Sequence, residues 1–455
     1  MMTGSLETHR DLKSLFMRRM AAQMFRKAAA LGIGLVGFFS LTLFIMMPDT
    51  LYRPKTTKQV LPEFRYVAAL NSVQLERLYA ANLTEVAREN EHRLSHVQHV
   101  CRNRREIREA FSIGEMWASP RHSIAFCVVP KVGCTYWKRI FRFIEKDYSD
   151  AGVNAPSDID RISVHYDKLS SVVRVDLRNP GDENNIVPAL KFMYTRDPYE
   201  RIWSAYLDKY FLPDFWHRAK GVAKALRPNV TSTSLKCGND VTFAELLEYI
   251  VNNRHFTDSE RRVNEHFQPT VFSCNPCKYP FDIIGKAETF AKDEGLILAS
   301  AWLLGKVSER KHSDRVLTEV NSLVDYNLDI KDKLNVYNNM ADECFSFIDV
   351  SRRLWKVFQF NGYIGDEVHF PDKKFDGLQD KDAYKKKLKE IIFELRKKAE
   401  TDTLNKWKLQ RKNSVQEAFR TLPATLIANF TTMFSYDFEL YQYEKHPDWL
   451  HRNHV

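Results

Sequence analysis

Two short segments combine basic side chains, hydroxyl groups and turn-forming residues at a spacing that could bind phosphate groups. In the first, PKVGCTYWKR at positions 130–139, a lysine and a glycine come just before a helix-like pattern that starts at Thr135. Gly133 allows a tight turn, and the free N–H groups at the start of a helix attract anions. Lys131 adds a positive charge and Thr135 a hydroxyl group for the same oxygens. The segment predicts a phosphate-binding turn, although a structural turn with an incidental lysine would look the same.

The second segment is TRDPYERIWSAY at positions 195–206. Arg196 ends a strand-like run, where its guanidinium group could clamp a phosphate, and Ser204, two helical turns further on, could point toward the same anion. Asp197 is expected to cap the following helix rather than to catalyse, with Pro198 at the first helical position. Taken alone, an Arg-Asp-Pro helix start is also compatible with a purely structural role.

The usual nucleotide-binding loop, GxxxxGK[ST], is absent from the sequence. Gly285-Lys286 and Gly305-Lys306 are not followed by serine or threonine, and no glycine precedes them at the required spacing. These observations argue against a kinase or an NTPase.

Each candidate segment joins a strand-like run to a helix-like run. SIAFCVVP at 123–130 leads into the first helix, and ALKFMYTR at 189–196 leads into the second. Two such units predict an α/β fold, a P-loop-like parallel sheet flanked by helices. Residues 295–412 contain Leu/Val-spaced helices and a lysine-rich run, and we interpret them as a helical insertion. The basic helix at about 380–411 is expected to be a solvated face, with polyanion binding as the less favoured alternative.

An uncharged run of 20 residues at 28–47 has the length of a membrane span, which needs about 20 residues. The preceding residues carry a surplus of roughly four positive charges, which keeps the N-terminus cytosolic. A cleaved signal peptide is the competing interpretation. The pattern predicts a cytosolic tail at 1–27, an uncleaved anchor at 28–47, a lumenal stem at 48–115 with a helix over about 67–108, and a folded domain at 116–455.

The sequons and cysteines agree with a lumenal location. The sequons at Asn82, Asn229 and Asn429 all follow the span. Seven cysteines fit an oxidising compartment in which several pair and at least one thiol stays free. Cys274-x-x-Cys277 could be half of a zinc site, but no second pair has fitting spacing, so disulfides are favoured.

Two further features leave alternatives open. His92, His96 and His99 could share one helical face as metal ligands, although a solvated face without metal is favoured. The formal charge of +10 fits either general solubility or a basic cleft for anionic ligands, and no nucleic-acid partner is expected.

Together the motifs resemble the membrane-bound carbohydrate sulfotransferases of the chondroitin/dermatan 4-sulfotransferase and HNK-1 sulfotransferase group. Positions 130–139 are similar to the family's 5′-phosphosulfate loop, PKVxCTxWKR, and positions 196–206 to its 3′-phosphate motif, RDPxERxxSAY. Positions 264–269, 274–277, 284–289 and 436–443 resemble its EHW-x-P, CxPC, IGKxET and C-terminal motifs. Phe267 replaces the usual Trp, Tyr136 replaces the usual Asn, and the insertion after Glu288 is a further departure.

The resemblance implies an enzyme that transfers a sulfuryl group from 3′-phosphoadenosine 5′-phosphosulfate (PAPS) to a sugar hydroxyl, in a single-pass type II Golgi membrane protein with a lumenal catalytic domain. Lys131 would assist the leaving phosphate, and His165 or His266 would be the general base. No metal is needed for this chemistry. The donor-binding residues implied are Pro130, Lys131, Val132, Gly133, Cys134, Thr135, Tyr136, Arg196, Asp197 and Ser204.

The resemblance favours the 4-hydroxyl of N-acetylgalactosamine in chondroitin or dermatan as the acceptor. N-glycan or HNK-1-type acceptors are an alternative. A lumenal glycan-binding protein with an inactive donor site is the main alternative from another class, and a nucleotide kinase or other phosphotransferase is a second.

Overall fold

The computed structural model describes residue 78 and the ranges 81–148, 152–169, 171–179, 189–253, 263–307, 312–333 and 342–450. The predicted tail at 1–27, the membrane anchor at 28–47 and the first part of the predicted stem lie outside the described residues. Within the described ranges, no helix combines the length and apolar character that a membrane span requires.

A mixed five-stranded sheet is the core of the fold, with the strand order β3-β1-β2-β4-β5. β2, β4 and β5 run parallel, and β1 pairs antiparallel with β2 and β3. The predicted parallel sheet is therefore confirmed for three strands, whereas the antiparallel edge was not predicted. Only residues 120–123 join β1 to β2, and so short a link forms a hairpin. The strands are β1 (Glu115–Ser119), β2 (Ile124–Cys127), β3 (Val173–Asp176), β4 (Leu190–Thr195) and β5 (Ile283–Lys286).

Both predicted strand-to-helix units are present. The first runs from β2 into α7 (Cys134–Ile144), and the second runs from β4 into α9 (Pro198–Tyr206). Trp137 and Phe141 of α7 pack against Phe126 and Phe192 of the sheet. Because β2 and β4 are parallel neighbours, the two candidate segments start side by side at the same edge of the sheet.

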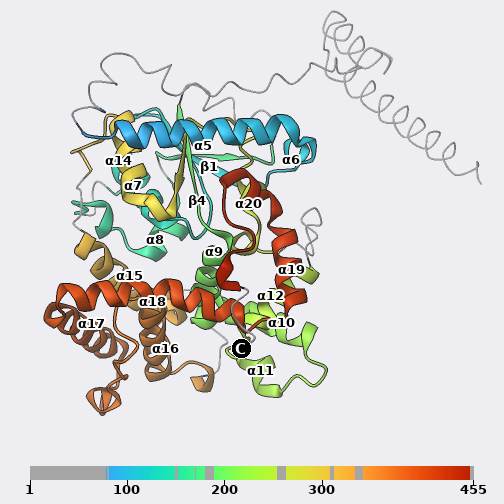
Figure 1. Cartoon of the computed structure of the whole chain (residues 1–455). Helices are drawn as coiled ribbons and strands as arrows, with labels where there is room; N and C mark the ends of the chain where they lie inside the picture. The colour runs from blue at the N-terminus through green and yellow to red at the C-terminus, as the bar shows by residue number, and fades with distance from the viewer. Residues whose placement is uncertain are drawn as a thin grey trace, which may run out of the picture. The chain divides into compact units, whose positions relative to one another are not determined.

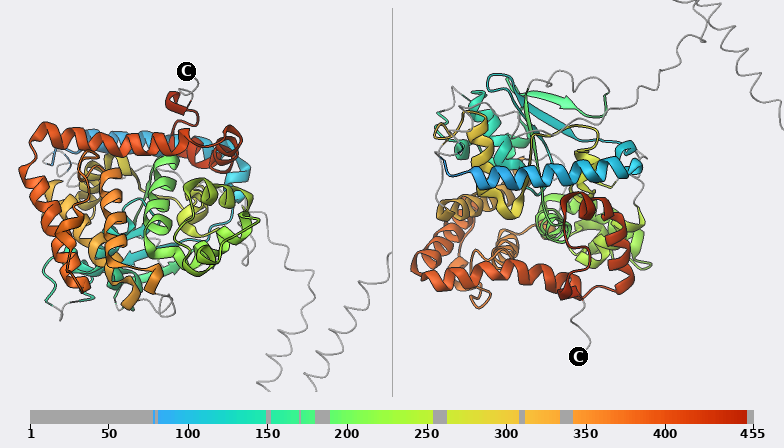
Figure 2. Two further views of the ribbon diagram at one scale, coloured as in Figure 1. Left: turned by 90° about the horizontal axis from the view of Figure 1, so that it is seen from below. Right: turned by 45° about the horizontal axis from the view of Figure 1, so that its top comes forward.

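The predicted stem contains α5 (Thr84–Asn103), followed by α6 (Arg105–Glu109). α5 lies alongside the strands in both Figure 1 and the right-hand view of Figure 2. The Asn90 amide donates to the carbonyl oxygen of Asp282 and accepts from the backbone N–H of Ile284, which fixes the helix to β5. α5 is therefore part of the folded domain rather than of a separate stem.

The three histidines of this helix do not form one site. His96 Nε2 lies 2.7 Å from the carbonyl oxygen of Glu439, in the C-terminal helix α20 (Ser435–Tyr441). His99 Nε2 instead contacts the Asn103 amide on its own helix. One of the three histidines thus has a structural role, because the His96 side chain joins α5 to α20.

A second hydrophobic cluster lies among the helices drawn below the sheet in Figure 1. The predicted insertion at 295–412 contributes Val320, Leu354 and Leu388 to this cluster, so the segment is packed into the core and is not a peripheral addition. The helices of this part and those that link it to the sheet are α8 (Arg161–Tyr166), α10 (Trp216–Leu226), α11 (Ser232–Cys237), α12 (Phe243–Asn252), α13 (Thr270–Ser273), α14 (Phe290–Ser300), α15 (His312–Lys333), α16 (Phe347–Phe360), α17 (Lys381–Lys398), α18 (Thr401–Arg420) and α19 (Ala424–Met433).

The lysine-rich helix α17 has one face paired with an acidic helix. Lys389 Nζ lies 2.5 Å from Asp325 of α15, and Lys385 forms an ion pair with Asp329 of the same helix. Part of the positive charge that suggested a solvated face or a polyanion site is thus used to dock α17 on α15.

Three disulfides connect Cys101 to Cys277, Cys127 to Cys274 and Cys237 to Cys344. The predicted disulfide framework is confirmed, and so is the prediction of an unpaired thiol, which is Cys134. Cys274 and Cys277 bind different partners, so neither is available as a zinc ligand. In the described part of the chain, no group of three or more His, Cys, Asp or Glu side chains is placed to hold a metal ion.

Candidate active site

The loop between β2 and α7 adopts a backbone that few sequences allow. Lys131 has φ of +69° and Gly133 has φ of +93°. A Cβ atom at Gly133 would lie 2.5 Å from the Phe290 side chain, so glycine is required by space as well as by conformation. Such a conformation at a lysine costs about 1–3 kcal/mol, a strain that is typical of ligand-binding loops. No side chain caps the start of α7, which leaves its first N–H groups available for an anion.

Lys131 belongs to a cluster of charges that the sequence analysis did not find. Its Nζ lies 2.9 Å from Asp208 Oδ2, and an Nη of Arg161 lies 2.8 Å from Asp208 Oδ1. Lys209, next to Asp208, forms an ion pair with Asp214. Burial would raise the pKa of Asp208, but Arg161 and Lys131 hold that pKa well below its ordinary value. Burial in turn lowers the pKa of Lys131.

His165 lies beside the loop on the short helix α8. Its Nε2 is 3.0 Å from the Thr135 hydroxyl oxygen. The surrounding cleft and the positive charges of Lys138 and Arg161 lower the pKa of His165 well below its ordinary value, although the ring is open to solvent and water screens part of this effect. The ring is therefore neutral near pH 7 and able to accept a proton.

His266 follows Asn264 in a single helical turn, Glu265–Phe267. The Asn264 side-chain oxygen accepts the backbone N–H of His266 and lies 2.7 Å from His266 Nδ1. Nδ1 therefore carries the ring proton, and Nε2 keeps a lone pair. Burial and the charge of Lys209 lower the pKa of His266 well below its ordinary value, with a smaller contribution from His165. The two predicted base candidates thus occupy one electrostatic environment.

The second candidate segment is tied to the first. The buried Arg196 guanidinium donates to Glu200 at 3.0 Å and to the carbonyl oxygen of Lys131 at 3.3 Å. The Asp197 side chain accepts from the N–H groups of Tyr199 and Glu200, so the prediction that it caps α9 is confirmed. Burial raises the pKa of Asp197 to about 7.

These groups surround a cavity of about 230 Å³. Of the predicted site residues, nine line it: Lys131, Gly133, Cys134, Thr135, Tyr136, His165, Arg196, Ser204 and His266. The other three do not: Pro130 lines the neighbouring cleft, Val132 is buried in the hydrophobic core, and Asp197 caps α9. Tyr136, which departs from the family motif, donates its hydroxyl to Glu294 of α14.

Sequence reasoning missed two groups of residues in this cavity. Asp208 and Lys209 are charged residues in the otherwise apolar run that continues α9, one turn after Ser204, and Arg161 lies one turn before His165. Those positions could have been noticed. The second group comes from residues 319–411 and has no local signal in the sequence: Glu319, Ser322, Leu323, Val357, Asn361, Tyr363 and Arg411.

A larger cleft of about 1060 Å³ opens next to the cavity. The two spaces share Arg161, His165, Lys209 and His266. Eight cations and four carboxylates line the cleft, so its charge is positive overall. The cations are Lys138, Arg142, Arg161, Lys168, Arg174, Arg178, Lys209 and Arg218; the carboxylates are Glu115, Asp167, Asp176 and Glu265.

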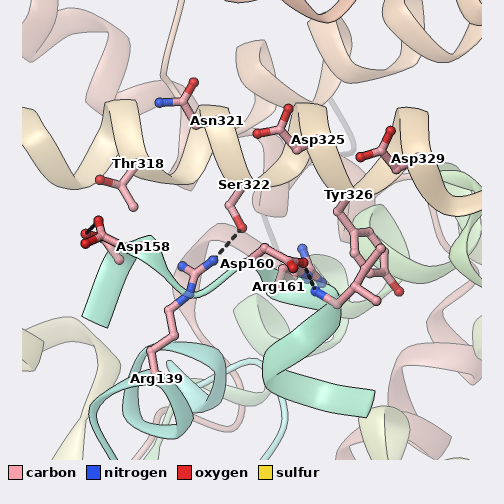
Figure 3. A pocket seen from close by; sticks show the side chains of 12 residues that line it. Arg139, Asp158, Asp160, Arg161, Thr318, Asn321, Ser322, Asp325, Tyr326 and Asp329 are labelled. Carbon is pink, nitrogen blue, oxygen red and sulfur yellow. Dashed lines mark hydrogen bonds between the residues drawn. The ribbon is translucent and has the colours of Figure 1, made fainter. Parts of the chain in front are cut away.

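Figure 3 shows a third space, behind α8, where α15 passes over α7 and α8. Arg139 of α7 donates to the Ser322 hydroxyl at 3.4 Å and to the carbonyl oxygen of Ile159 at 2.8 Å. The Arg161 guanidinium lies 4.5 Å from the ring centre of Tyr326. These contacts hold α8 from behind, so that Arg161 and His165 keep their places in the cavity wall.

The remaining family-like motifs contribute mainly to the framework. Asp437, in the C-terminal motif, accepts the backbone N–H groups of Thr270 and Val271, and Arg201 donates to the carbonyl oxygen of Gln268. These buried contacts fix the segment that carries His266. The motif at 264–269 is thereby joined to both the second candidate segment and the C-terminal helix.

Comparison with known proteins gives the class of this site. Residues 114–359, more than half of the chain, match the profile described as "Sulfotransferase family". The chain belongs to the sulfotransferase family. This sulfotransferase is 26% identical to carbohydrate sulfotransferase 11 of Rattus norvegicus over 275 residues, which cover 59% of this chain and 76% of that protein. It is 31% identical to carbohydrate sulfotransferase 9 of Homo sapiens over 193 residues, 41% of each chain. No solved structure matches the chain.

The predicted recognition of a sulfotransferase is therefore confirmed, and the match also extends over the first part of the segment interpreted as an insertion. Membership in the sulfotransferase family implies PAPS as the sulfate donor. PAPS has two anionic ends. The cavity offers one group of cations, Lys131, Arg161 and Lys209 around Asp208, and a further guanidinium group, that of Arg196. The residues of the cavity therefore fit this donor.

Proposed function

We propose that this sulfotransferase transfers a sulfuryl group from PAPS to a glycan hydroxyl, and that the acceptor is the 4-hydroxyl of N-acetylgalactosamine in chondroitin or dermatan. The observation that carries the proposal is the junction of the two spaces. The cavity that fits the donor opens into a large basic cleft, and His165 lines both. A donor in the cavity and a polymer in the cleft would meet at this histidine.

On the donor side, the protein mainly positions charges. When bound, PAPS supplies the sulfuryl group and leaves as adenosine 3′,5′-bisphosphate. Lys131 and the free N–H groups at the start of α7 stabilise negative charge on the leaving phosphate. Asp208 keeps Lys131 and Arg161 in place before the ligand arrives, so little reorganisation is needed.

On the acceptor side, a base must remove the proton of the attacking hydroxyl group. His165 is the favoured base because its ring is neutral and its Nε2 lies beside Thr135, at the start of α7. His266 is the alternative, with Nε2 unprotonated and with Asn264 fixing the ring. Both lie on the boundary between the cavity and the cleft.

The character of the cleft supports an anionic glycan. Its excess of arginine and lysine suits a polymer in which uronic acids alternate with amino sugars, because the uronic acids carry repeated carboxylates. Tyr166, adjacent to the proposed base, is 59% exposed within the cleft. An exposed aromatic ring of this kind offers an apolar face to one side of a sugar.

We also propose a lumenal Golgi location, with a cytosolic tail at 1–27, an anchor at 28–47 and the catalytic domain beyond. The three disulfides support an oxidising compartment. The sequon asparagines Asn82, Asn229 and Asn429 are all exposed, as glycan attachment requires. The similarity to proteins named carbohydrate sulfotransferases points the same way.

The test is transfer of radiolabelled sulfate from PAPS by the full-length protein to a panel of desulfated chondroitin, dermatan, heparan and N-glycan acceptors, followed by disaccharide analysis. We expect 4-sulfated N-acetylgalactosamine from chondroitin or dermatan. Sulfation of the N-glycans alone would replace the acceptor assignment. Absence of transfer to every acceptor, together with no thermal stabilisation by adenosine 3′,5′-bisphosphate, would overturn the enzymatic proposal in favour of a glycan-binding protein.

A further inference from the structure

Part of the lining of the donor cavity comes from a segment of the chain that no motif marked. Arg411 of α18 lines the same cavity as Arg196 and Ser204 of α9. These three residues supply two guanidinium groups and one hydroxyl group. Such a combination is suited to a phosphate monoester, because guanidinium groups bind phosphate through two parallel hydrogen bonds.

The position of Arg411 is fixed by its neighbours on α18. The Gln410 amide donates to the carbonyl oxygens of Gln359 and Ile364, at 2.8 and 3.0 Å. The Ser414 hydroxyl oxygen accepts from the Trp203 indole N–H at 3.2 Å, and Trp203 directly precedes Ser204. α18 is therefore docked on α9 at the point where the predicted phosphate-binding serine lies.

A glycine provides a second close approach at the same place. Gly362 has φ of +68°, and a Cβ atom there would lie 2.1 Å from the carbonyl oxygen of Trp407. The chain after α16 thus runs directly against α18, and it brings Tyr363 into the cavity beside Arg411. Arg411 accordingly projects from a rigid support, although it belongs to the end of the chain.

The charges around Arg411 leave it available for a ligand. In the described residues, the guanidinium group of Arg411 makes no hydrogen bond or ion pair, whereas Arg196 is paired with Glu200. Glu200 also lies within electrostatic range of Arg411 and Lys412, and Glu319 lines the cavity. Burial and the nearby charge of Arg411 both lower the pKa of Arg196, as expected where two cations face one space. A dianionic phosphate would relieve this repulsion.

We propose that Arg411 binds the 3′-phosphate of the donor, together with Arg196 and Ser204. The inference rests on the proposed use of PAPS, and it assigns a donor-binding role to α18. Arg196 alone, paired with the carboxylate of Glu200, leaves a phosphate dianion undercompensated. Arg411 supplies the missing charge from α18, so that the 3′-phosphate is held between α9 and α18. Arg411 thereby also selects donors that carry a 3′-phosphate.

The experiment compares two ligands that differ only in this group, adenosine 3′,5′-bisphosphate and adenosine 5′-monophosphate. Their dissociation constants are measured by calorimetry with the full-length protein in detergent. The ratio of the two constants reports the contribution of the 3′-phosphate. We expect Arg411→Ala to raise the dissociation constant of the bisphosphate about 10- to 100-fold, the range for a charged hydrogen-bonded contact. The dissociation constant of the monophosphate should change less than about twofold. Arg411→Lys should recover part of the loss, because it keeps the charge without the fork.

Lys408→Ala is the matched control. Lys408 is an exposed cation one turn earlier on α18, outside the cavity lining, and its replacement removes the same charge. We expect both dissociation constants to stay within about twofold of the wild-type values. A loss equal to that of Arg411→Ala would mean that only the general positive potential matters, which would overturn the assignment.

The failures are distinguishable. If wild-type protein binds neither ligand, the PAPS proposal fails and the role of Arg411 fails with it. If wild-type protein prefers the bisphosphate and Arg411→Ala keeps that preference unchanged, the role of Arg411 alone is wrong. An equal loss of both ligands in Arg411→Ala would also overturn it. Because Arg411 is exposed, the melting temperature of the unliganded variant should match that of wild type and exclude misfolding.

Discussion

The cavity proposed for the donor and the cleft proposed for the acceptor meet at His165, but they are built differently. In the cavity, the side chains of Lys131 and Arg161 are 19% and 10% exposed and share the carboxylate of Asp208. In the cleft, the side chains of Arg174 and Arg178 are 64% and 54% exposed. Buried charges of fixed geometry suit one small ligand bound in one pose. Exposed charges suit a polymer whose affinity is the sum of many weak contacts.

The largest effects should come from the cavity. Lys131→Ala and Arg196→Ala should each abolish donor binding, because each removes a largely buried cation and leaves the carboxylate of Asp208 or Glu200 with less compensation. Calorimetry with adenosine 3′,5′-bisphosphate measures this loss. Lys146 is an exposed lysine after α7, and the control variant Lys146→Ala should bind adenosine 3′,5′-bisphosphate normally. Donor binding retained by Lys131→Ala would remove the distinction between the two regions.

Replacing His165, where the cavity meets the cleft, should affect turnover but not donor binding. His165→Ala should keep its affinity for adenosine 3′,5′-bisphosphate while kcat falls about 100-fold or more, since a general base contributes about 10² to 10⁴ in rate. Single-turnover sulfate transfer measures the chemical step. His266→Ala should have the smaller effect. A fully active His165→Ala enzyme would transfer the role of base to His266.

The same histidine should set the pH dependence. The surrounding cleft and the charges of Lys138, Arg161 and Lys209 lower the pKa of His165, whereas Asp208 opposes the shift. The base form therefore persists below the ordinary histidine pKa of about 6.5, and the acid limb of kcat/KM should lie below that pH. Lys138→Gln removes one of the cations, so it should move the acid limb to higher pH. An unchanged acid limb in Lys138→Gln would argue that another group titrates.

The smallest single effects belong to the cleft. Arg174→Ala and Arg178→Ala should each raise the KM for the acceptor about two- to fivefold and leave the KM for PAPS unchanged, because exposed charges contribute roughly 0.2–1 kcal/mol each. Added salt should raise the acceptor KM more steeply than the donor KM, since it screens exposed charges first. Lys386→Ala, on the exposed part of α17, is the matched control. Equal salt sensitivity of both KM values would show that the two regions do not differ in this way.

The sequence predicted the local part of this architecture. A glycine turn between β2 and α7, and Asp197 with Pro198 at the start of α9, are signals confined to a few consecutive residues. Both strand-to-helix units and their parallel arrangement followed from them. β1, β3 and β5 were not foreseen, because no helix-start motif follows β1 or β3 and the pairing of β1 with β3 joins residues far apart in the sequence.

The parts that were not predicted depend on contacts between distant residues. The sequence of α5 has the pattern of an isolated stem helix. Only the hydrogen bonds of Asn90 to the backbone of Asp282 and Ile284 show that the helix packs on the sheet. α18 has the pattern of a solvated basic helix, and only its docking on α9 brings Arg411 into the cavity. The spacing of residues within each of these helices does not indicate which face packs against the rest of the protein.

The disulfides also order events during synthesis. Cys274 and Cys277 lie in one short loop, yet they close bonds to Cys127 and Cys101, which were made 147 and 176 residues earlier. At a translation rate of about 5–20 residues per second, Cys101 waits roughly 10 to 35 s for its partner. Before Cys274 is made, the growing chain also carries the thiols of Cys134, which has no native partner, and of Cys237, whose partner Cys344 is made later. The sheet and α5 therefore become covalently joined only once this loop has been synthesised, and correct pairing requires that neither Cys101 nor Cys127 bonds to Cys134 or Cys237.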